Sequence, residues 1–287
     1  MIANDLKAKA LEIRQMLWTM TMKAGRGHLP SCFSCTDILI ALYYGRFLRY
    51  NPVQPKDPSR DRLIMSKGHA AAALYPILAD LGFFPKAELD NYTELGSLLG
   101  MYANPSIPGI EAISDSLGHG LGIGCGFALA AKHDGLDYKT YVILGDAECN
   151  EGSVWESAAF ASHYSLNNLI AIVDYNRLGV LGPTVAIGSL AFEGTHGARW
   201  PLNSLYDRWA SFGWSVYRTN GHNFEELLAA LQLPGRPIHT PCVVIADTVK
   251  GKGVPFMEGR PEWHNRIPNL EQQRLGRLAL GLESPNA

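Results

Sequence analysis

The chain has 287 residues and a formal net charge of −2, with 18% charged and 47% hydrophobic residues. This balance is typical of a globular protein rather than a disordered one, and the lack of a basic excess predicts no nucleic-acid partner. No apolar run approaches the roughly 18 residues of a membrane span, and the N-terminal segment lacks the apolar stretch of a signal peptide. We therefore expect no membrane association.

The five cysteines bear on the compartment of the protein. Their odd number, together with the lack of an export signal, predicts reduced thiols and a cytoplasmic protein. Cys32 and Cys35 have the CxxC spacing of some metal and redox sites, but no second pair follows. We interpret them as two small buried residues of a helix.

The start of the chain predicts two helices. Residues 6–20 carry apolar side chains at helical spacing, with Asn4 or Asp5 as the N-cap. This helix should end at the glycines and the proline of residues 25–30, and a second helix is expected over residues 36–47.

Loops and one strand follow. The segment 51–60 contains three prolines and should be a loop. Residues 62–65 predict a short buried strand, and an alanine-rich helix is expected after His69. The long connection 96–118 contains glycines and prolines, and connections of this length are typically functional when they are ordered.

The second half of the chain alternates between strands and helices. Apolar runs predict strands over residues 141–144, 169–173, 215–218 and 243–246. Helices are expected over residues 154–164, 205–212 and 224–231. Asn223 should cap the last helix, with Glu226 in capping-box position. Continuously apolar strands separated by helices predict an α/β fold with three layers, in which helices cover both faces of a mainly parallel sheet. Such sheets bind ligands at the carboxyl ends of their strands.

Two of these strand ends carry oxygen ligands. Asp146 follows one strand directly, and Asn176 follows the next, so both should lie at the same edge of the sheet. A carboxylate, an amide oxygen and a nearby carbonyl suit Mg²⁺, with diphosphate oxygens completing its octahedral shell. The helix that begins after Asp146 would add positive potential near the phosphates. The alternative is an acidic N-cap and a turn asparagine, which are common at strand ends.

The segment 145–152, with the sequence Gly-Asp-Ala-Glu-Cys-Asn-Glu-Gly, together with Asp174-Tyr175-Asn176, resembles the thiamine diphosphate motif of transketolases. Four further segments resemble motifs of the same family in the same order: residues 24–28, 61–70, 116–120, and 250–253 with 263–264. The resemblance covers nearly the whole chain and is closest to the N-terminal subunit of transketolases that are split into two chains. It implies a thiamine-diphosphate-binding fold, with residues 1–287 forming a single domain of the type that binds the diphosphate.

The resemblance also implies roles for individual residues. Mg²⁺ would be held by the side chains of Asp146 and Asn176 and by the carbonyl of Leu178. The residues expected to face the thiazolium and the substrate are His28, His69 and His264. The residues expected to bind thiamine diphosphate are Lys67, Ser116, Leu117, Gly118, Gly145, Asp146, Ala147, Glu148, Asn176 and Lys250. Glu151 and Glu156 would lie where the family couples subunits, and His119 is expected to act through its backbone.

One catalytic group of the family is expected on another chain. The glutamate that activates the cofactor comes from a second, pyrimidine-binding domain, and the chain ends after the last motif of the first domain. We therefore expect a separate C-terminal partner subunit and an α₂β₂ assembly. A partly apolar face should be exposed until that partner binds.

Three positions depart from the family pattern. Ala147 replaces a glycine, which would be unfavourable if the backbone there had a positive φ. Asp115 replaces a small residue before the 116–118 motif. The histidine of the family's Gly-His-Pro motif falls on Met101, whose thioether cannot donate a hydrogen bond to a sugar hydroxyl. This loss would cost roughly 0.5–1.5 kcal/mol for a sugar donor, so we expect a donor other than the standard sugar phosphates.

The expected activity is transfer of a two-carbon ketol or acyl unit from a ketose or oxo donor to an aldehyde-type acceptor. Two alternatives stay open at this point. One is a related thiamine enzyme that decarboxylates a 2-oxo acid and transfers the product. The other is a non-catalytic scaffold subunit that binds the cofactor.

Overall fold

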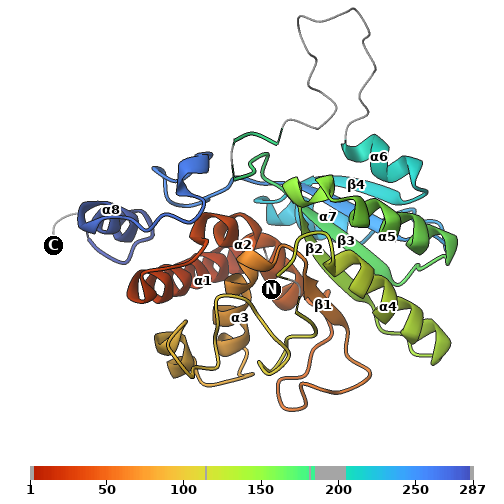
Figure 1. The fold of residues 1–287 in the computed structure, drawn as a ribbon, viewed down its shortest axis with the longest axis horizontal. Coiled ribbons are helices and arrows are strands. Elements are labelled where there is room, and N and C mark those ends of the chain that lie inside the picture. Colours follow the sequence, from red (N-terminus) through yellow and green to blue (C-terminus); the bar gives the residue numbers. More distant parts are fainter. Residues whose placement is uncertain (1–2, 114, 181, 185–204, 285–287) are drawn as a thin grey trace, which may run out of the picture.

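The structure is a computed structural model that describes residues 3–113, 115–180, 182–184 and 205–284. Its centre is a five-stranded sheet with the order β1-β2-β3-β5-β4, in which all neighbours are parallel (Figure 1). The strands are β1 (Arg62–Met65), β2 (Thr140–Gly145), β3 (Leu169–Tyr175), β4 (Ser215–Asn220) and β5 (Cys242–Asp247). The five predicted strands are confirmed, and β2 to β5 extend one or two residues beyond their predicted ends.

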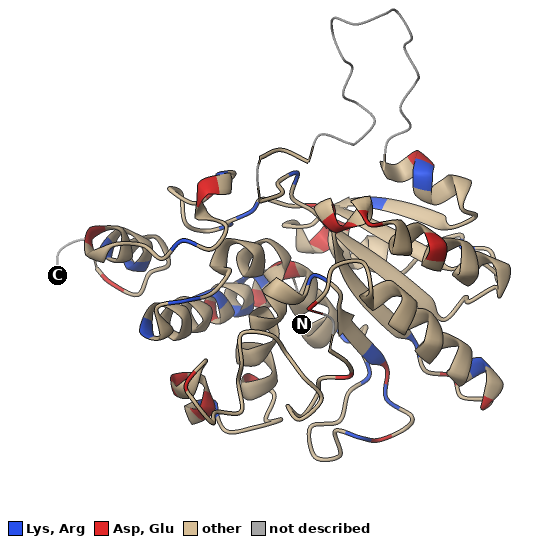
Figure 2. Ribbon diagram, in the orientation of Figure 1, with Lys and Arg blue, Asp and Glu red and all other residues tan. Residues whose placement is uncertain are grey.

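Helices surround the sheet. The α-helices are α1 (Ala3–Ala24), α2 (Leu29–Tyr44), α3 (Leu74–Asp80), α4 (Gly120–His133), α5 (Gly152–His163), α6 (Leu205–Ser211), α7 (Phe224–Leu231) and α8 (Leu270–Ala279). Short 3-10 helices are η1 (Gly68–Ala73), η2 (Lys86–Asn91), η3 (Ala147–Asn150) and η4 (Pro261–Trp263). Acidic and basic residues occur in the helical layers on both sides of the sheet (Figure 2). None of the helices in the described ranges is long and apolar enough to cross a membrane.

The sheet separates two hydrophobic clusters. In β2, Tyr141 and Ile143 lie in a cluster with residues of α1, α2, α3 and α7, whereas Val142 and Leu144 lie in a cluster with residues of α4 and α5. Because alternate side chains of a strand point to opposite faces, both faces of the sheet are covered (Figure 1). The predicted three-layer α/β/α architecture is confirmed, and burial on both faces explains why the strands are apolar throughout.

The first two helices differ from their predicted bounds. Asn4 and Asp5 lie inside α1, so the prediction that one of them is its N-cap is wrong. The second helix begins at Leu29 rather than near residue 36 and ends at Tyr44. Pro30 occupies its first turn, where a missing backbone N–H costs nothing. The proline therefore starts α2 instead of only ending the helix before it.

The sequence does not predict the glycine-rich helix α4, because its glycines lower helix propensity. The structure gives their physical reason. A Cβ at Gly120 would lie 2.4 Å from the side chain of Ser66, and one at Gly124 would lie 2.5 Å from Val142 Cγ2. The glycines therefore let α4 pack directly against the strands β1 and β2. The terminal helix α8 is likewise absent from the sequence predictions.

Other local predictions are confirmed, except that the predicted capping box at Asn223 is only half formed. Between η2 and α4 the described residues contain no helix or strand, as expected for the long connection. The side chain of Asn223 caps α7 by accepting from the backbone N–H groups of Glu225 and Glu226. Glu226 contacts the Asn223 side chain at 2.7 Å rather than its backbone, so this is half of a capping box. Cys32 and Cys35 are free and buried in α2.

Candidate active site

The carboxyl ends of β2, β3 and β5 lie level with one another. Gly145 in β2 pairs with Asp174 in β3, and Asp174 pairs with Ala246 in β5. The residues that directly follow these ends therefore lie side by side, as the parallel sheet predicts. They include Asp146 after β2 and Asn176 after β3, which the sequence places at one edge.

Asp146 is a buried carboxylate at this edge, with 7% of the residue exposed. Burial raises the pKa of Asp146 to about 6, partly offset by the Thr184 hydroxyl, which donates to Oδ2. Among the described residues no lysine, arginine or histidine forms an ion pair with this carboxylate. A buried carboxylate of this kind gains stability from a bound cation.

The segment after β3 presents two more oxygen atoms. Oδ1 of Asn176 accepts from the backbone N–H of Leu178 at 3.0 Å. Between them, Arg177 has a φ of 61°, which turns the chain sharply. The Asp146 carboxylate, the Asn176 amide oxygen and the Leu178 carbonyl form a set of hard oxygen ligands that fits Mg²⁺. Their role in binding metal stays a prediction.

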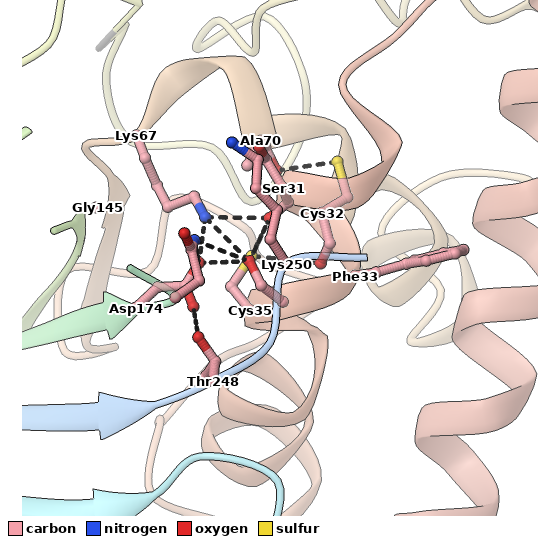
Figure 3. Close-up of polar contacts among 12 residues, drawn as sticks. Ser31, Cys32, Phe33, Cys35, Lys67, Ala70, Gly145, Asp174, Thr248 and Lys250 are labelled. Carbon is pink, nitrogen blue, oxygen red and sulfur yellow. Dashed lines mark hydrogen bonds and ion pairs between the residues drawn. The ribbon is translucent and has the colours of Figure 1, made fainter. Parts of the chain in front are cut away.

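A buried ion pair between Lys67 and Asp174 adjoins Asn176. Figure 3 shows this pair with its hydrogen bonds. Nζ of Lys67 donates to Oδ2 of Asp174 and to the carbonyl of Ser31 at 3.0 Å, and the two charged side chains are 1% and 0% exposed. Burial is the largest single influence on the pKa of Asp174 and would raise it, but the Lys67 cation and the hydrogen bonds from Lys67, Ser34 and Thr248 together lower this pKa. Thr248 from the segment after β5 and Ser34 from α2 also donate to Asp174.

This ion pair orients Asn176. Nδ2 of Asn176 donates to Oδ2 of Asp174 at 3.2 Å, which sets the amide plane. The amide oxygen accepts from Leu178 and keeps its second lone pair for a metal. Lys67 contacts Asp174 and Ser31 in the structure, and its predicted direct contact with the cofactor stays a prediction. Lys67 also acts indirectly: it holds the Asp174 carboxylate, which in turn orients the side chain of Asn176.

Three histidines from distant parts of the chain form a triangle. His28 precedes α2, His69 lies in η1, and His264 follows η4. Their ring centroids are 5.4 Å apart for His28 and His69, 5.1 Å for His28 and His264, and 5.3 Å for His69 and His264. The structure brings together the three residues that the sequence predicts to face the substrate.

The three imidazoles are neutral at pH 7. Burial, followed by the Lys67 cation, lowers the pKa of His69 to about 2. Burial and the Lys250 cation lower the pKa of His264 to about 4, and the same two causes lower that of His28. Nδ1 of His28 is buried and has no hydrogen-bond partner among the described residues. Such an atom is expected to meet a ligand, because an unpaired buried polar atom is costly.

Lys250 joins the histidine triangle to the strand ends. Its Nζ lies 2.9 Å from Nδ1 of His264 and 3.4 Å from the carbonyls of Leu178 and Gly179. Burial, followed by the Lys67 cation, lowers the pKa of Lys250 to about 8. The amine is therefore cationic at pH 7, beside the predicted ligands of the metal.

A glutamate holds the loop that precedes α4. Oε1 of Glu148 accepts from the backbone N–H of Gly118 at 2.8 Å and Oε2 from that of Gly145 at 2.9 Å, and the Ser66 hydroxyl also donates to it. Burial raises the pKa of Glu148. Gly118 has a φ of 84° and is buried, whereas the preceding Leu117 is exposed. The predicted cofactor loop 116–118 is thus fixed to the end of β2 through Glu148.

The replacement of glycine by Ala147 causes no backbone strain. Ala147 lies in η3 and is not among the residues with positive φ, so its methyl group is compatible with the local backbone. Ser116 and Asp115 are both exposed at the start of the loop that leads to Gly118, and the cofactor-binding role predicted for Ser116 stays a prediction.

Comparison with known proteins agrees with this geometry. The family model for the transketolase thiamine diphosphate binding domain matches residues 6–286. The chain belongs to the transketolase family. It is 40% identical over 272 residues to an apulose-4-phosphate transketolase subunit of Phocaeicola vulgatus, covering 95% of this chain and 92% of that one. It is 37% identical over 262 residues to the 6-deoxy-6-sulfo-D-fructose transketolase subunit SqwG of a Clostridium species, covering 91% and 90%.

Longer transketolases match over part of their length. The chain is 39% identical over 286 residues to the transketolase of Pongo abelii and covers 97% of itself but 43% of that protein. It superimposes on the crystal structure of the Campylobacter jejuni transketolase with a TM-score of 0.86 at 30% identity, covering 98% of this chain and 43% of that one. The chain thus spans less than half of these transketolases.

Several residues that shape the site escape prediction from the sequence. Ser34 and Thr248 donate hydrogen bonds to Asp174, and Thr184 donates one to Asp146, yet no sequence motif marks these three residues. The place of Asp174 at a strand end singles it out, but its ion pair with Lys67 is not foreseen. The sequence does indicate that Asp174 has some buried partner, because an aspartate in an otherwise apolar strand requires one, but it does not show which residue this is.

Proposed function

We propose that this chain is the N-terminal, diphosphate-binding subunit of a split transketolase-type enzyme. It transfers a two-carbon ketol unit from a ketose donor to an aldehyde acceptor. The observation that supports this most directly is the position of Asp146 beside Asn176 at one sheet edge, next to Lys250 and the histidine triangle. The scaffold alternative would leave this buried cationic and imidazole cluster without a use.

The donor set fits a magnesium diphosphate. Mg²⁺ would be held by Asp146, Asn176 and the Leu178 carbonyl, and Lys250 would neutralise diphosphate charge. The loop 116–118 would contact the cofactor from the other side. Bound thiamine diphosphate supplies the electron sink that accepts the electron pair of the breaking carbon–carbon bond.

The neutral imidazoles position and polarise the substrate. A neutral imidazole has one donor and one acceptor, so His28, His69 and His264 can bind hydroxyl and carbonyl groups as charge shifts between them. Nδ1 of His264 accepts from the cationic Lys250, which leaves Nε2 protonated and able to donate to a substrate oxygen.

The complete enzyme requires a second subunit. The pyrimidine-binding domain with the activating glutamate is expected on a separate chain, in an α₂β₂ complex. Two similar proteins that this chain covers almost completely are themselves named as subunits, which supports the split arrangement. Five free, buried cysteines are compatible with the reducing conditions of the cytoplasm, where we expect the complex.

The donor is a specialised ketose rather than the standard sugar phosphates. Sδ of Met101 accepts from the hydroxyl of Tyr92 at 3.5 Å. That hydroxyl lies beside Gly27, since a Cβ at Gly27 would be 3.6 Å from it, so Met101 is connected through Tyr92 to the segment that carries His28. A thioether there offers no donor to a sugar hydroxyl. Two similar subunits are named for apulose-4-phosphate and for 6-deoxy-6-sulfo-D-fructose.

The test is co-expression with the chain encoded beside its gene, followed by assays of ketose cleavage with thiamine diphosphate and Mg²⁺. We expect activity only when both chains are present, and higher turnover of a modified ketose than of xylulose 5-phosphate. Activity of this chain alone would contradict the split arrangement. Turnover of pyruvate but not of any ketose would favour the 2-oxo-acid alternative, and cofactor binding without any turnover would favour the scaffold.

A further inference from the structure

A chain of buried polar contacts links α1 and α2 to the backbone of the segment that carries Lys250. Arg14 in α1 donates from Nη1 and Nη2 to the two carboxylate oxygens of Asp37 in α2, both at 2.8 Å. Oδ2 of Asp37 lies 2.6 Å from Nδ1 of His222, in the turn between β4 and α7. The backbone N–H of Val249 donates to Nε2 of His222 at 2.8 Å. The three side chains are only 6–12% exposed.

These contacts fix the tautomer of His222. Asp37 is ionised, because the Arg14 guanidinium and the His222 hydrogen bond more than offset the effect of burial and lower its pKa. A carboxylate only accepts hydrogen bonds, so Nδ1 of His222 must carry a proton. The Val249 N–H can only donate, so Nε2 must keep its lone pair. His222 is therefore a neutral imidazole protonated at Nδ1, with its acceptor directed at the main chain.

Lys250 lies between two anchored peptide groups. On one side, Val249 is held by His222, and on the other, the N–H of Gly251 donates to the carbonyl of Pro30 at 2.9 Å. Pro30 is two residues from His28, so this second anchor ties Lys250 to the histidine triangle. These two hydrogen bonds fix the position of the Lys250 Cα. Its side chain extends from there to His264 and the Leu178 carbonyl.

We propose that His222 is a positioning residue: by accepting from the Val249 N–H, it sets where the Lys250 ammonium meets the anionic diphosphate. Both ring nitrogens of His222 are engaged by Asp37 and Val249, so it acts on Lys250 only through the backbone. Arg14 and Asp37 complete the arrangement, because they hold the Nδ1 proton in place and so direct the lone pair of Nε2 to Val249. This inference rests on the proposed function, since it assigns Lys250 to the diphosphate.

Two substitutions distinguish the hydrogen bond of His222 to Asp37 from its hydrogen bond to Val249. In His222→Asn, the amide reaches the position of Nδ1 and can serve Asp37, but it is too short to accept from Val249. In His222→Gln, the amide oxygen reaches the position of Nε2 and can accept from Val249, while Asp37 keeps its two bonds from Arg14. His133→Asn is the matched control, because the side chain of His133 is 87% exposed.

The main readout is the Kd of thiamine diphosphate with Mg²⁺ for the full chain in complex with its partner subunit, measured by calorimetry. We expect His222→Asn to weaken binding roughly three- to tenfold, the effect of one lost hydrogen bond, and His222→Gln to stay close to wild type. Rescue by glutamine is the result that a merely structural role would not produce. Equal affinities of the two variants, whether both normal or both reduced, would overturn the proposal.

Two further measurements on the full chain do not depend on the cofactor. The ¹⁵N shifts of labelled histidine should show His222 as the Nδ1-protonated neutral tautomer, and amide exchange at Val249 should be faster in His222→Asn than in His222→Gln. An Nε2-protonated or cationic His222 would overturn the proposal directly. If the wild-type complex does not bind thiamine diphosphate at all, the proposed function is wrong. The tautomer and the amide exchange can still be measured in that case, so they show separately whether the role proposed for His222 is wrong.

Discussion

Replacing Lys67 by methionine should destabilise the fold by about 3 kcal/mol. The substitution preserves most of the side-chain volume but leaves the carboxylate of Asp174 buried at 0% exposure without its cation. Removing one partner of a buried ion pair typically costs about 3–5 kcal/mol. The value should fall at the lower end, because Ser34, Asn176 and Thr248 still donate to Asp174.

The assay is urea unfolding, with a double variant as the critical comparison. Lys67→Met combined with Asp174→Asn removes both charges while keeping their shapes, so it should be more stable than Lys67→Met alone by at least about 1 kcal/mol. Lys23→Met is the control, because Lys23 and Asp90 form an exposed pair with side chains 57% and 65% exposed. It should change stability by less than about 0.5 kcal/mol.

Two results would refute this reasoning about Lys67. One is a loss of less than about 1 kcal/mol in Lys67→Met, which would mean that water or another cation reaches Asp174. The other is a double variant whose loss equals the sum of the single losses, because the two groups would then not be coupled.

Three further predictions concern the site and the surface. Lys250 has a pKa of about 8 and is cationic below it. The affinity for thiamine diphosphate, measured by calorimetry, should therefore weaken by about tenfold as pH rises through 8. In Lys250→Arg this loss of affinity should be absent, because arginine stays cationic. Gly118→Ala should cost about 2–3 kcal/mol in urea unfolding, because φ is 84° and the new Cβ would lie 2.6 Å from Glu151 Cβ. Gly126→Ala is the control and should not destabilise the protein, because a Cβ at this position in α4 would meet open space. The pKa of Asp80 is lowered to about 2, because its hydrogen bonds from lysines and Tyr44 outweigh burial. The contribution of the Asp80 carboxylate to folding stability is therefore complete above about pH 4 and is lost as pH falls through 2. In urea unfolding, Asp80→Asn should cost about 1 kcal/mol at pH 7 and nearly nothing at pH 2.

The sheet could be predicted well from the sequence, for a physical reason. Strands such as β3 are buried on both faces, so their apolar runs are uninterrupted and stand out from the amphipathic helices around them. The parallel arrangement then places Asp146 beside Asn176 without further information. The helix α4 is missed because its glycines are explained only by contacts with β1 and β2, which the sequence does not show locally.

Within the site, residues in motifs are predicted more readily than the residues that hold them. The three histidines lie in distant motifs, and only the fold shows that their rings are within 5.4 Å of one another. The burial of Lys67 against Asp174 and the contact of His222 with Val249 depend on pairs separated by 107 and 27 residues. Local pattern and propensity carry no information about such pairs.

The diphosphate-binding role of this chain is tested most directly by titrating thiamine diphosphate into the two-chain complex with and without Mg²⁺. Wild-type complex should bind the cofactor tightly only when Mg²⁺ is present, and Asp146→Asn should remove most of this dependence on Mg²⁺ because it removes the one anionic metal ligand proposed for this chain. Binding that is equally tight without Mg²⁺, or unchanged in Asp146→Asn, would contradict a magnesium diphosphate site at the ends of β2 and β3.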